Sequence, residues 1–239
     1  MLSIIDLTKK FGSFTAVNSL NLTVMPGDIY GFLGPNGAGK TTTIKIAAGL
    51  YSPSKGKVLI NGMDNQEFPI ETKSLTGYVP DQPFLYDKLT GREFLYFSAG
   101  LYKMDKNSVR SRVNNLIDEL NIGTWIDKRT EEYSQGMRQR IAIASSFLHS
   151  PKLILLDEPM AGLDPQTAVL VKNLLKRTAE EGAAVLLSTH SLAVAEEVCT
   201  KVAVLKEGQI IFDDKKEAVD QFKEKLKLNF ESFFLELTK

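Results

Sequence analysis

The sequence contains little cysteine and no long apolar run. Its 239 residues include one cysteine, Cys199, and this excludes an internal disulfide framework or a zinc site built from several cysteines. No apolar segment approaches the roughly 20 residues that a helix needs to cross a bilayer. The first residues also lack the charged and then apolar pattern of a secretion signal. We therefore expect a soluble chain, for which any function at a membrane requires a partner.

A net charge is also absent, because 29 Lys and Arg residues balance 29 Asp and Glu residues. This balance provides no general attraction to nucleic acid or to an anionic membrane, although it leaves room for a local patch. The composition is otherwise ordinary for a globular protein, with 43% hydrophobic and 24% charged residues. At this length we expect one well-buried domain with a side lobe.

The order of the predicted elements indicates an α/β fold. Residues 1–30 alternate as short strands do, and a compact apolar strand at 28–33 leads into a glycine-rich loop. From residue 89 to residue 149 the apolar spacing becomes helical. Strand signals then return three times, at residues 153–157, 184–189 and 202–206. This alternation predicts a mainly parallel sheet covered on both faces, with the helical block inserted between its strands.

The glycine-rich loop has the sequence Gly-Pro-Asn-Gly-Ala-Gly-Lys-Thr at residues 34–41, between a predicted strand and a predicted helix. In such a phosphate loop the backbone N–H groups wrap the phosphates, and the helix N-terminus adds a favourable dipole. Lys40 can reach the β- and γ-phosphates, Thr41 can bind Mg²⁺, and Thr42 can contact the α-phosphate. The residues predicted to bind the nucleotide here are Gly34, Pro35, Asn36, Gly37, Ala38, Gly39, Lys40, Thr41 and Thr42.

Two adjacent carboxylates, Asp157 and Glu158, end a continuous apolar strand. An unpaired carboxylate at a buried strand end is unfavourable, and a metal ion offsets that cost. Because phosphoryl-transfer sites use a strand-end Asp for Mg²⁺, we assign Asp157 to the metal. Glu158 is then placed to act as a general base for the attacking water, or at least to orient it. His190 ends another predicted strand, so it should face the same ligand as Asp157.

A further turn, Tyr-Ser-Gln-Gly-Met-Arg-Gln-Arg at residues 133–140, precedes a predicted helix. Ser134 can cap that helix, and the N–H groups at its N-terminus would suit a phosphate. By itself the turn indicates only the start of a helix.

Together these motifs resemble those of the ATP-binding cassette (ABC) ATPases, and the resemblance covers nearly the whole chain. It implies an α/β P-loop NTPase core of the RecA-like type, an antiparallel β subdomain and an inserted α-helical signature subdomain. The core with its β subdomain would comprise residues 1–88 and 150–212, and the helical subdomain residues 89–149. Residues 213–239 would form a C-terminal helical tail, all within a single ABC ATPase domain.

The resemblance also implies a head-to-tail dimer, homomeric or heteromeric, in which two ATP molecules are sandwiched. In that arrangement Ser134, Gln135, Gly136 and Met137 act on the ATP of the partner chain and stabilise charge there. Asp164 matches the loop that communicates across the dimer.

Three residues would be catalytic in such a site: Lys40, Glu158 and His190. The histidine that matches His190 in the family contacts the γ-phosphate and helps to order the attacking water. Phe11 matches the aromatic residue that usually stacks on adenine, with packing in the core as the alternative.

The chain departs from the family pattern at two places. Asp81 stands where a glutamine usually follows Tyr-Val-Pro, and Gln82 is displaced by one position. That glutamine links Mg²⁺ to the transporter-facing lobe, so Asp81 joins Thr41 and Asp157 as a candidate metal ligand. The signature turn differs from the commoner Leu-Ser-Gly-Gly-Gln and resembles that of bacterial exporter ATPases whose membrane subunits are separate polypeptides.

The resemblance therefore implies the ATP-binding and ATP-hydrolysing subunit of a membrane ABC transporter, an exporter by its signature turn, with ATP and Mg²⁺ as ligands. ATP binding would close the dimer and hydrolysis reopen it, and these motions would drive transmembrane permease subunits that dock near residues 81–95. Phe84, Leu85 and Tyr86 are candidates for the docking surface, with core packing as the alternative. The subunit would be cytoplasmic and would lie on the inner face of the cell membrane through its permease.

The alternative function is that of a soluble ABC ATPase acting on nucleic acid or ribosomes. Neutral net charge and the lack of a basic aromatic tract weigh against it, so we expect no nucleic-acid partner. Two features remain outside the predicted site. His149 lies at the apparent end of a helix, where a cation is favoured, and is interpreted as structural. The aromatic side chains of the tail most simply pack on the cassette, with dimerisation or regulation as the alternative.

Overall fold

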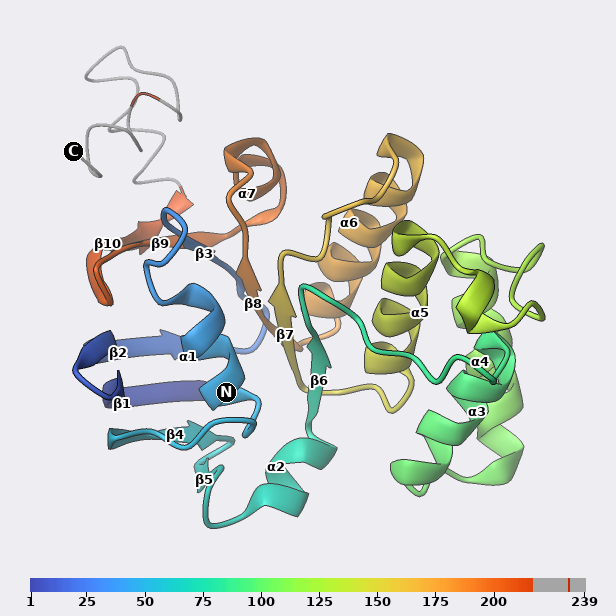
Figure 1. Ribbon diagram of the computed structural model, residues 1–239, viewed down its shortest axis with the longest axis horizontal. Helices are drawn as coiled ribbons and strands as arrows, with labels where there is room; N and C mark the ends of the chain where they lie inside the picture. Colours follow the sequence, from blue (N-terminus) through green and yellow to red (C-terminus); the bar gives the residue numbers. More distant parts are fainter. Residues whose placement is uncertain (217–231, 233–239) are drawn as a thin grey trace.

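Two sheets and a lobe of helices make up the computed structural model, which describes residues 1–216 and residue 232. The helical lobe lies at one end of the molecule, and the four-stranded sheet lies at the other end beside one edge of the six-stranded sheet (Figure 1). Of the predicted tail, only residues 213–216 and 232 are described. Residues 213–215 continue a strand rather than begin a helix, and the remaining predictions for the tail lie outside the described residues.

The six-stranded sheet has the order β10-β9-β3-β8-β7-β6. Its strands are β3 (Ile29–Leu33), β6 (Thr76–Val79), β7 (Leu153–Asp157), β8 (Ala184–Ser188), β9 (Lys201–Lys206) and β10 (Gln209–Lys215). All neighbouring pairs are parallel except β9 with β10, which is antiparallel. The strands β3, β7 and β8 are buried along their whole length, as expected for parallel strands covered on both faces. The predicted parallel sheet is confirmed.

Alternate residues of the central strands divide the interior into two cores. In β3, Ile29 and Leu33 join a core that extends into the helical lobe, whereas Tyr30 and Phe32 join a second core. This division follows from the period of two along a strand, which sends successive side chains to opposite faces. The second core also takes residues of α1 (Lys40–Ala47) and of the four-stranded sheet.

The four-stranded sheet has the order β2-β1-β4-β5 and is antiparallel throughout. Its strands are β1 (Leu2–Phe11), β2 (Phe14–Val24), β4 (Lys55–Ile60) and β5 (Met63–Asp64). Buried and exposed residues alternate in much of β2, because one face of the sheet packs on α1 while the other faces solvent. This sheet is the antiparallel β subdomain that the resemblance implied.

The helical lobe is formed by α3 (Gly91–Leu101), α4 (Lys106–Glu119), η1 (Thr130–Glu132) and α5 (Gln135–Phe147). Polar side chains cap its three α-helices: Thr90 and Glu93 form a capping box on α3, Asp105 caps α4, and Ser134 caps α5. Such caps satisfy N–H groups that the helices leave unpaired and stabilise each helix by about 1 kcal/mol. The other helices are α2 (Pro69–Ser74), α6 (Pro165–Glu180) and α7 (Leu192–Val198).

His149 joins the helical lobe to the parallel sheet. Its ring stacks on Tyr102 with centroids 3.7 Å apart and an interplanar angle of 9°, and its Nε2 lies 3.2 Å from the carbonyl oxygen of Thr76. Burial lowers the pKa of His149 to about 4, so the ring is neutral at physiological pH. The structural role is therefore retained, but the expectation of a cation at the helix end is wrong.

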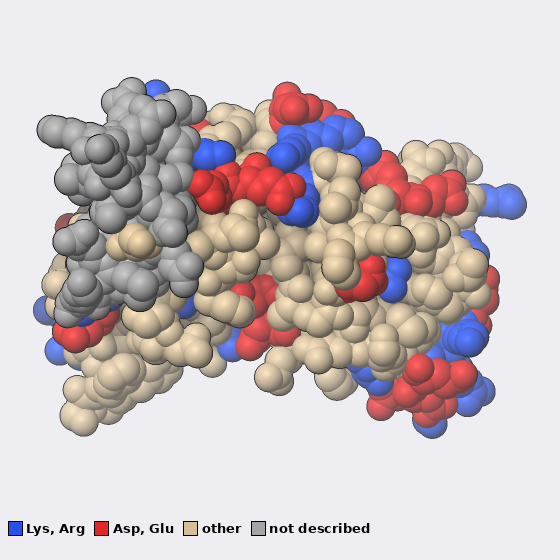
Figure 2. Space-filling model, turned by 90° about the horizontal axis from the view of Figure 1, so that it is seen from above, with Lys and Arg blue, Asp and Glu red and all other residues tan. Residues whose placement is uncertain are grey.

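Charge is mixed on the surface. In the face shown in Figure 2, groups of Lys and Arg side chains lie beside groups of Asp and Glu side chains, and the described part of this face has no continuous basic stripe. Among residues 1–216 and 232, no helix is both long and apolar enough to span a membrane.

Candidate nucleotide-binding site

The predicted site residues meet at one edge of the parallel sheet. The glycine-rich loop follows β3, Asp157 ends β7 with Glu158 directly after it, and His190 follows β8. These three strands are neighbours, with β8 between β3 and β7. Because neighbouring parallel strands end at the same edge, the residues that follow them converge there.

The glycine-rich loop brings its backbone close to other segments. Gly39, the N-cap of α1, has φ 103°, and a Cβ atom there would lie 2.5 Å from the carbonyl oxygen of Ala16. Only glycine adopts that conformation without strain and leaves room for the approach. The loop therefore turns sharply into α1, whose N-terminal N–H groups point at the site.

Lys40 folds back over this loop. Its Nζ donates hydrogen bonds to the carbonyl oxygens of Gly34 at 2.6 Å and Pro35 at 3.0 Å. Burial lowers the pKa of Lys40, while Glu158 and Asp157 act in the opposite direction. The ammonium group is thus held against the glycine-rich loop by two backbone acceptors.

Asp157 is fully buried and only half satisfied. Its Oδ1 accepts hydrogen bonds from Ser188 Oγ at 2.5 Å and from Thr41 Oγ1 at 3.1 Å. Its Oδ2 is buried and has no hydrogen-bond partner among the described residues. Burial raises the pKa of Asp157, and the bonds from Ser188 and Thr41 oppose that shift. A buried carboxylate oxygen beside a threonine hydroxyl is a fitting oxygen donor set for Mg²⁺.

Glu158 and His190 are in contact. The Oε2 atom of Glu158 lies 2.9 Å from Nδ1 of His190. Glu158 adopts φ 50°, a left-handed conformation that is uncommon for residues other than glycine. Its backbone N–H donates to the carbonyl oxygen of Ser188 at 3.1 Å, which ties the residue to the end of β8. The strained backbone thus directs the Glu158 side chain toward His190.

Two cavities adjoin this edge and share Glu158, Asp81 and Asn36. The first has a volume of about 300 Å³, and its lining is Phe14, Ala16, Asn36, Gly37, Ala38, Gly39, Lys40, Thr41, Thr42, Asp81 and Glu158. The second has a volume of about 500 Å³, and its lining is Gly34, Pro35, Asn36, Asp81, Gln82, Gln135, Glu158, Ala161 and His190. The structure thus brings together the whole predicted loop, Asp81, Glu158 and His190.

Asp81 and Gln82 take different places at these cavities. Asp81 borders both of them, whereas Gln82 borders the second, beside His190. Asp81 also lies close enough to contribute to the raised pKa of Asp157. The displaced glutamine therefore still reaches the site, and the chain adds a carboxylate to it.

The aromatic residue in the wall of the first cavity is Phe14, which the sequence interpretation missed. Phe11 is 47% exposed and packs edge-on against Tyr51 at 5.9 Å, with Lys9 Nζ 5.0 Å from its ring. The alternative that Phe11 packs in the core is therefore wrong. Phe11 and Phe14 pair across the turn between β1 and β2. Recognising this hairpin in the sequence would have placed Phe14 beside Phe11 as a second candidate for the aromatic contact.

The turn that caps α5 packs against the loop that follows Glu158. Ser134 Oγ accepts a hydrogen bond from the backbone N–H of Met137 at 3.3 Å, which confirms Ser134 as the N-cap. A Cβ atom at Gly136 would lie 2.7 Å from the carbonyl oxygen of Gly162. Of the residues in this turn, Gln135 enters the wall of the second cavity, while Ser134 is exposed.

Two further contacts connect α5 with the same loop. Gln139 is buried, and its Nε2 donates to the carbonyl oxygen of Pro159 at 3.3 Å. Arg140 pairs with Asp164 at 4.0 Å. Asp164 also caps α6, because its carboxylate accepts hydrogen bonds from the backbone N–H and the hydroxyl of Thr167, and these bonds lower its pKa. The predicted communicating loop is thus held between α5 and α6.

Comparisons with known proteins point to one family. The family model described as "ABC transporter" matches residues 17–161. An uncharacterized ABC transporter ATP-binding protein of Nostoc (all4389) is 36% identical over 198 residues, which cover 82% of this chain and 58% of that protein. The SkfA peptide export ATP-binding protein SkfE of Bacillus subtilis is 33% identical over 213 residues, which cover 89% of this chain and 88% of SkfE.

Two solved structures share the fold. An ATP-binding subunit of an ABC transporter superposes with a TM-score of 0.92 at 30% identity, and the match covers 100% of both chains. A dimeric ATP-binding cassette in a post-hydrolysis state, bound to ADP and phosphate, superposes with a TM-score of 0.82 at 26% identity. That match covers 90% of this chain and 99% of the cassette.

Proposed function

This chain belongs to the ABC transporter family as an ATP-binding subunit, and from that premise we propose that it hydrolyses ATP in a head-to-tail pair of cassettes and drives export through separate permease subunits. The observation that carries the proposal is the 2.9 Å contact between Glu158 and His190, beside the loop of Lys40. It supports the proposal because a carboxylate and an imidazole meet in the wall of the cavity that the glycine-rich loop also lines.

ATP would occupy the cavities at the sheet edge. The backbone N–H groups of residues 34 and 36–42 and the ammonium group of Lys40 bind the phosphates. An exposed aromatic side chain, Phe11 or Phe14, stacks on adenine. Thr41 and Asp157 would hold Mg²⁺, with Asp81 as a further ligand or as a partner of a metal-bound water. The ion, when bound, neutralises charge on the β- and γ-phosphates.

Hydrolysis needs a base for the attacking water and donors for the developing charge. The oxygen of the water bonds to the γ-phosphorus, and the bond from that phosphorus to the ADP oxygen breaks. Glu158 accepts the proton that the water loses. His190 orients Glu158 and the γ-phosphate. Lys40 stabilises the charge that builds up on the phosphate oxygens.

The exposed signature turn supports a second copy, or a related chain, as the partner. Ser134, Gln135, Gly136 and Met137 present the N-terminus of α5 outward, and a γ-phosphate held by the partner would accept hydrogen bonds there. The solved cassette bound to ADP and phosphate is a dimer, which favours this arrangement.

Aromatic side chains near residues 84–97 support docking of a permease. Phe84 is 80% exposed and lies edge-on to Tyr86 at 5.7 Å, and Tyr86 contacts Phe97 at 5.4 Å and Phe94 at 6.2 Å. We call Phe84, Tyr86, Phe94 and Phe97 the aromatic patch. Leu85 is buried, so the three predicted docking residues divide between surface and core. Exposed apolar patches of this kind indicate a protein partner, and through a permease the subunit would lie on the inner face of the cell membrane.

The direction of transport is supported by the signature turn and by SkfE, whose name assigns it to peptide export. Co-purification from detergent-solubilised membranes should recover a multi-spanning partner. Recovery of ribosomes or DNA in its place would contradict the transporter role.

Replacement of the proposed base tests the chemistry. We expect Glu158→Gln to keep ATP affinity and to reduce turnover by about 10²–10⁴-fold, because the amide cannot accept the proton of the water. Phosphate release and nucleotide binding are measured side by side, with Glu67→Gln, an exposed carboxylate on the β subdomain side, as the control. Near-normal hydrolysis by Glu158→Gln would contradict the assignment.

A further inference from the structure

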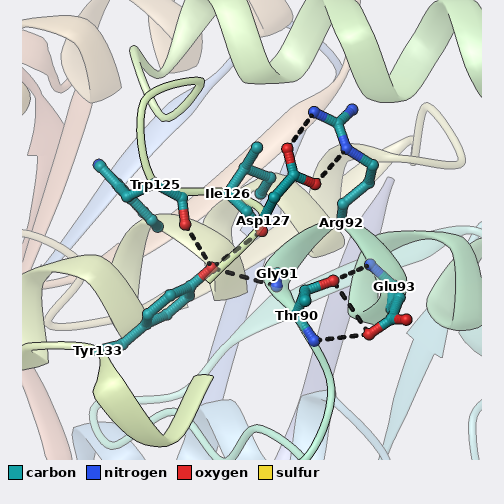
Figure 3. A network of polar contacts seen from close by, with 8 residues as sticks. All are labelled: Thr90, Gly91, Arg92, Glu93, Trp125, Ile126, Asp127 and Tyr133. Carbon is teal, nitrogen blue, oxygen red and sulfur yellow. Dashed lines mark hydrogen bonds and ion pairs between the residues drawn. The ribbon is translucent and has the colours of Figure 1, made fainter. Parts of the chain in front are cut away.

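Tyr133 is the first residue of the signature turn, and its side chain joins three segments of the helical lobe (Figure 3). The side chain is buried, with 6% of its surface exposed. Its hydroxyl oxygen lies 3.1 Å from the backbone nitrogen of Gly91 and 3.2 Å from the carbonyl oxygens of Trp125 and Ile126. The hydroxyl therefore accepts a hydrogen bond from Gly91 and donates one to a carbonyl of the 125–126 segment.

The fit around this hydroxyl is close. A Cβ atom at Gly91 would lie 2.5 Å from the hydroxyl oxygen and 2.9 Å from Cδ1 of Ile126. The ring of Tyr133 also packs edge-on against Trp125, with centroids 5.0 Å apart. Glycine at position 91 thus allows the hydroxyl to reach the start of α3, and the surrounding side chains leave it little freedom.

The start of α3 is itself tied to the segment before the signature turn. Arg92 forms two hydrogen bonds with the carboxylate of Asp127, at 2.7 and 3.1 Å. Thr90 and Glu93 complete the capping box (Figure 3). The paired carboxylate and the bonded carbonyl groups are adjacent in sequence, so the start of α3, residues 125–127 and the Tyr133 hydroxyl are joined at neighbouring points.

Further hydrogen bonds connect these segments to the aromatic patch and to α5. Thr130 is fully buried, and its hydroxyl donates to the carbonyl oxygen of Tyr86 at 2.9 Å. Its backbone N–H donates to the carbonyl oxygen of Leu89 at 2.9 Å. Arg138, in the first turn of α5, reaches back to the carbonyl oxygen of Tyr133 at 3.4 Å. A chain of hydrogen bonds therefore leads from the patch to the signature turn.

We propose that the Tyr133 hydroxyl is a positioning group that fixes the signature turn relative to the start of α3 and so transmits displacement of the aromatic patch to Ser134. The inference rests on the proposed function, in which the patch docks a permease and Ser134 serves the ATP of a partner chain. Tyr133 touches neither ATP nor the reacting atoms. Without its hydroxyl, Gly91 N–H loses its acceptor in a buried place, and α3 and the turn are no longer held at one point.

Hydrogen exchange in the isolated chain tests the positioning directly. Tyr133→Phe keeps the ring and removes the hydroxyl. We expect exchange at the amides of Gly91, Met137 and Arg138 to become about fivefold to tenfold faster, the range that the loss of one buried hydrogen bond gives. Gly91→Ala, which crowds the hydroxyl, should accelerate the same amides. Tyr96→Phe, an exposed tyrosine on the same helix, should leave them unchanged. Unchanged exchange at Met137 and Arg138 in Tyr133→Phe would overturn the proposal.

ATP-dependent pairing gives a second readout that a merely structural role would not move. In a Glu158→Gln background, Tyr133→Phe should weaken pairing by about fivefold while ATP affinity of the single chain stays the same. Equal pairing with and without the Tyr133 hydroxyl would also overturn the proposal. If Glu158→Gln alone does not pair, the proposed partner-chain function fails, and the exchange measurement still decides the role of Tyr133.

Discussion

The sheet edge and the helical lobe hold their proposed site residues in different ways. At the sheet edge, Asp157 is fully buried and Glu158 is tied to Ser188, so backbone neighbours hold these side chains without any partner chain. In the lobe, Ser134 is exposed and its cap leaves the N-terminus of α5 facing outward. The difference teaches that the sheet-edge half of the proposed site is held by contacts within the chain, whereas the signature turn is left exposed, as the proposed use on a second chain requires.

Contacts between α5 and the loop after Glu158 join the helical lobe to the sheet edge. Gly136 packs against Gly162, and Gln139 donates to Pro159. Glu158 immediately precedes Pro159, so the position of the base depends on α5 of its own chain. We infer that a shift of the signature turn would be felt at both sites of a pair.

The largest effect is expected at the buried carboxylate of the sheet edge. Asp157→Asn should reduce hydrolysis by about 10³-fold, because an amide binds Mg²⁺ poorly. The same change should leave the free energy of unfolding unchanged or raise it by about 1 kcal/mol, because a buried charge is removed. Thermal unfolding with and without Mg²⁺ and ATP separates the two effects, with the exposed Asp118→Asn as the control. Full stabilisation of Asp157→Asn by Mg²⁺ with ATP would contradict the metal assignment.

The signature turn should give a large effect of a different kind. Ser134→Arg should reduce hydrolysis by about 10²–10³-fold while ATP affinity of the single chain is kept, because the lost donors act on another chain's phosphate. Turnover and equilibrium binding are compared with those of Ser111→Arg, on the exposed side of α4. Weaker ATP binding by the single chain would show that the turn belongs to the chain's own site. It would contradict the proposed division between the sheet edge and the turn.

The contribution of His149, which joins the helical lobe to the parallel sheet, to the free energy of unfolding should depend on pH. The pKa of His149 is about 4 in the folded chain, below its unfolded value of 6.5, so the unfolded chain binds more protons between these values. Its contribution to stability is fully present above pH 6.5 and is lost as pH falls toward 4, by about 1–2 kcal/mol after allowance for its partial exposure. Denaturant unfolding of the chain and of His149→Phe across this range should show the smaller pH dependence in the variant. Identical pH profiles would refute the shift.

The smallest effect is expected at the hydrogen bond between Gln139 of α5 and the loop after Glu158. Gln139→Leu should reduce kcat by about fivefold, with ATP affinity unchanged, because the Pro159 carbonyl loses a hydrogen bond worth about 1 kcal/mol. Steady-state kinetics are compared with those of Gln166→Leu, an exposed glutamine on α6. An unchanged kcat would show that Gln139 does not position Glu158.

The residues that the sequence placed correctly are those governed by local rules. A strand that leads into a phosphate loop and two strands that lead to Asp157 and His190 must meet at one edge if the sheet is parallel. The N-cap at Ser134 likewise depends only on its own turn.

The features that the sequence did not reveal depend on distant neighbours. Phe11 and Phe14 flank one turn with equal apolar character, and only the site of the cavity distinguishes them. The neutral state of His149 follows from its burial, which lowers its pKa, and that burial comes from packing against residues far away in the sequence such as Tyr102. The junction at Tyr133 joins residues 35 to 42 positions apart in sequence, so no local pattern could reveal it.

A mixing experiment tests most directly whether each ATP is hydrolysed between two chains. Glu158→Gln lacks the base but keeps the signature turn, and Ser134→Arg lacks the turn but keeps the base. Each variant alone should be nearly inactive, whereas an equal mixture should recover about a quarter of the unmodified activity, since half of random pairs contain one intact site. A mixture no more active than its two components would contradict the account.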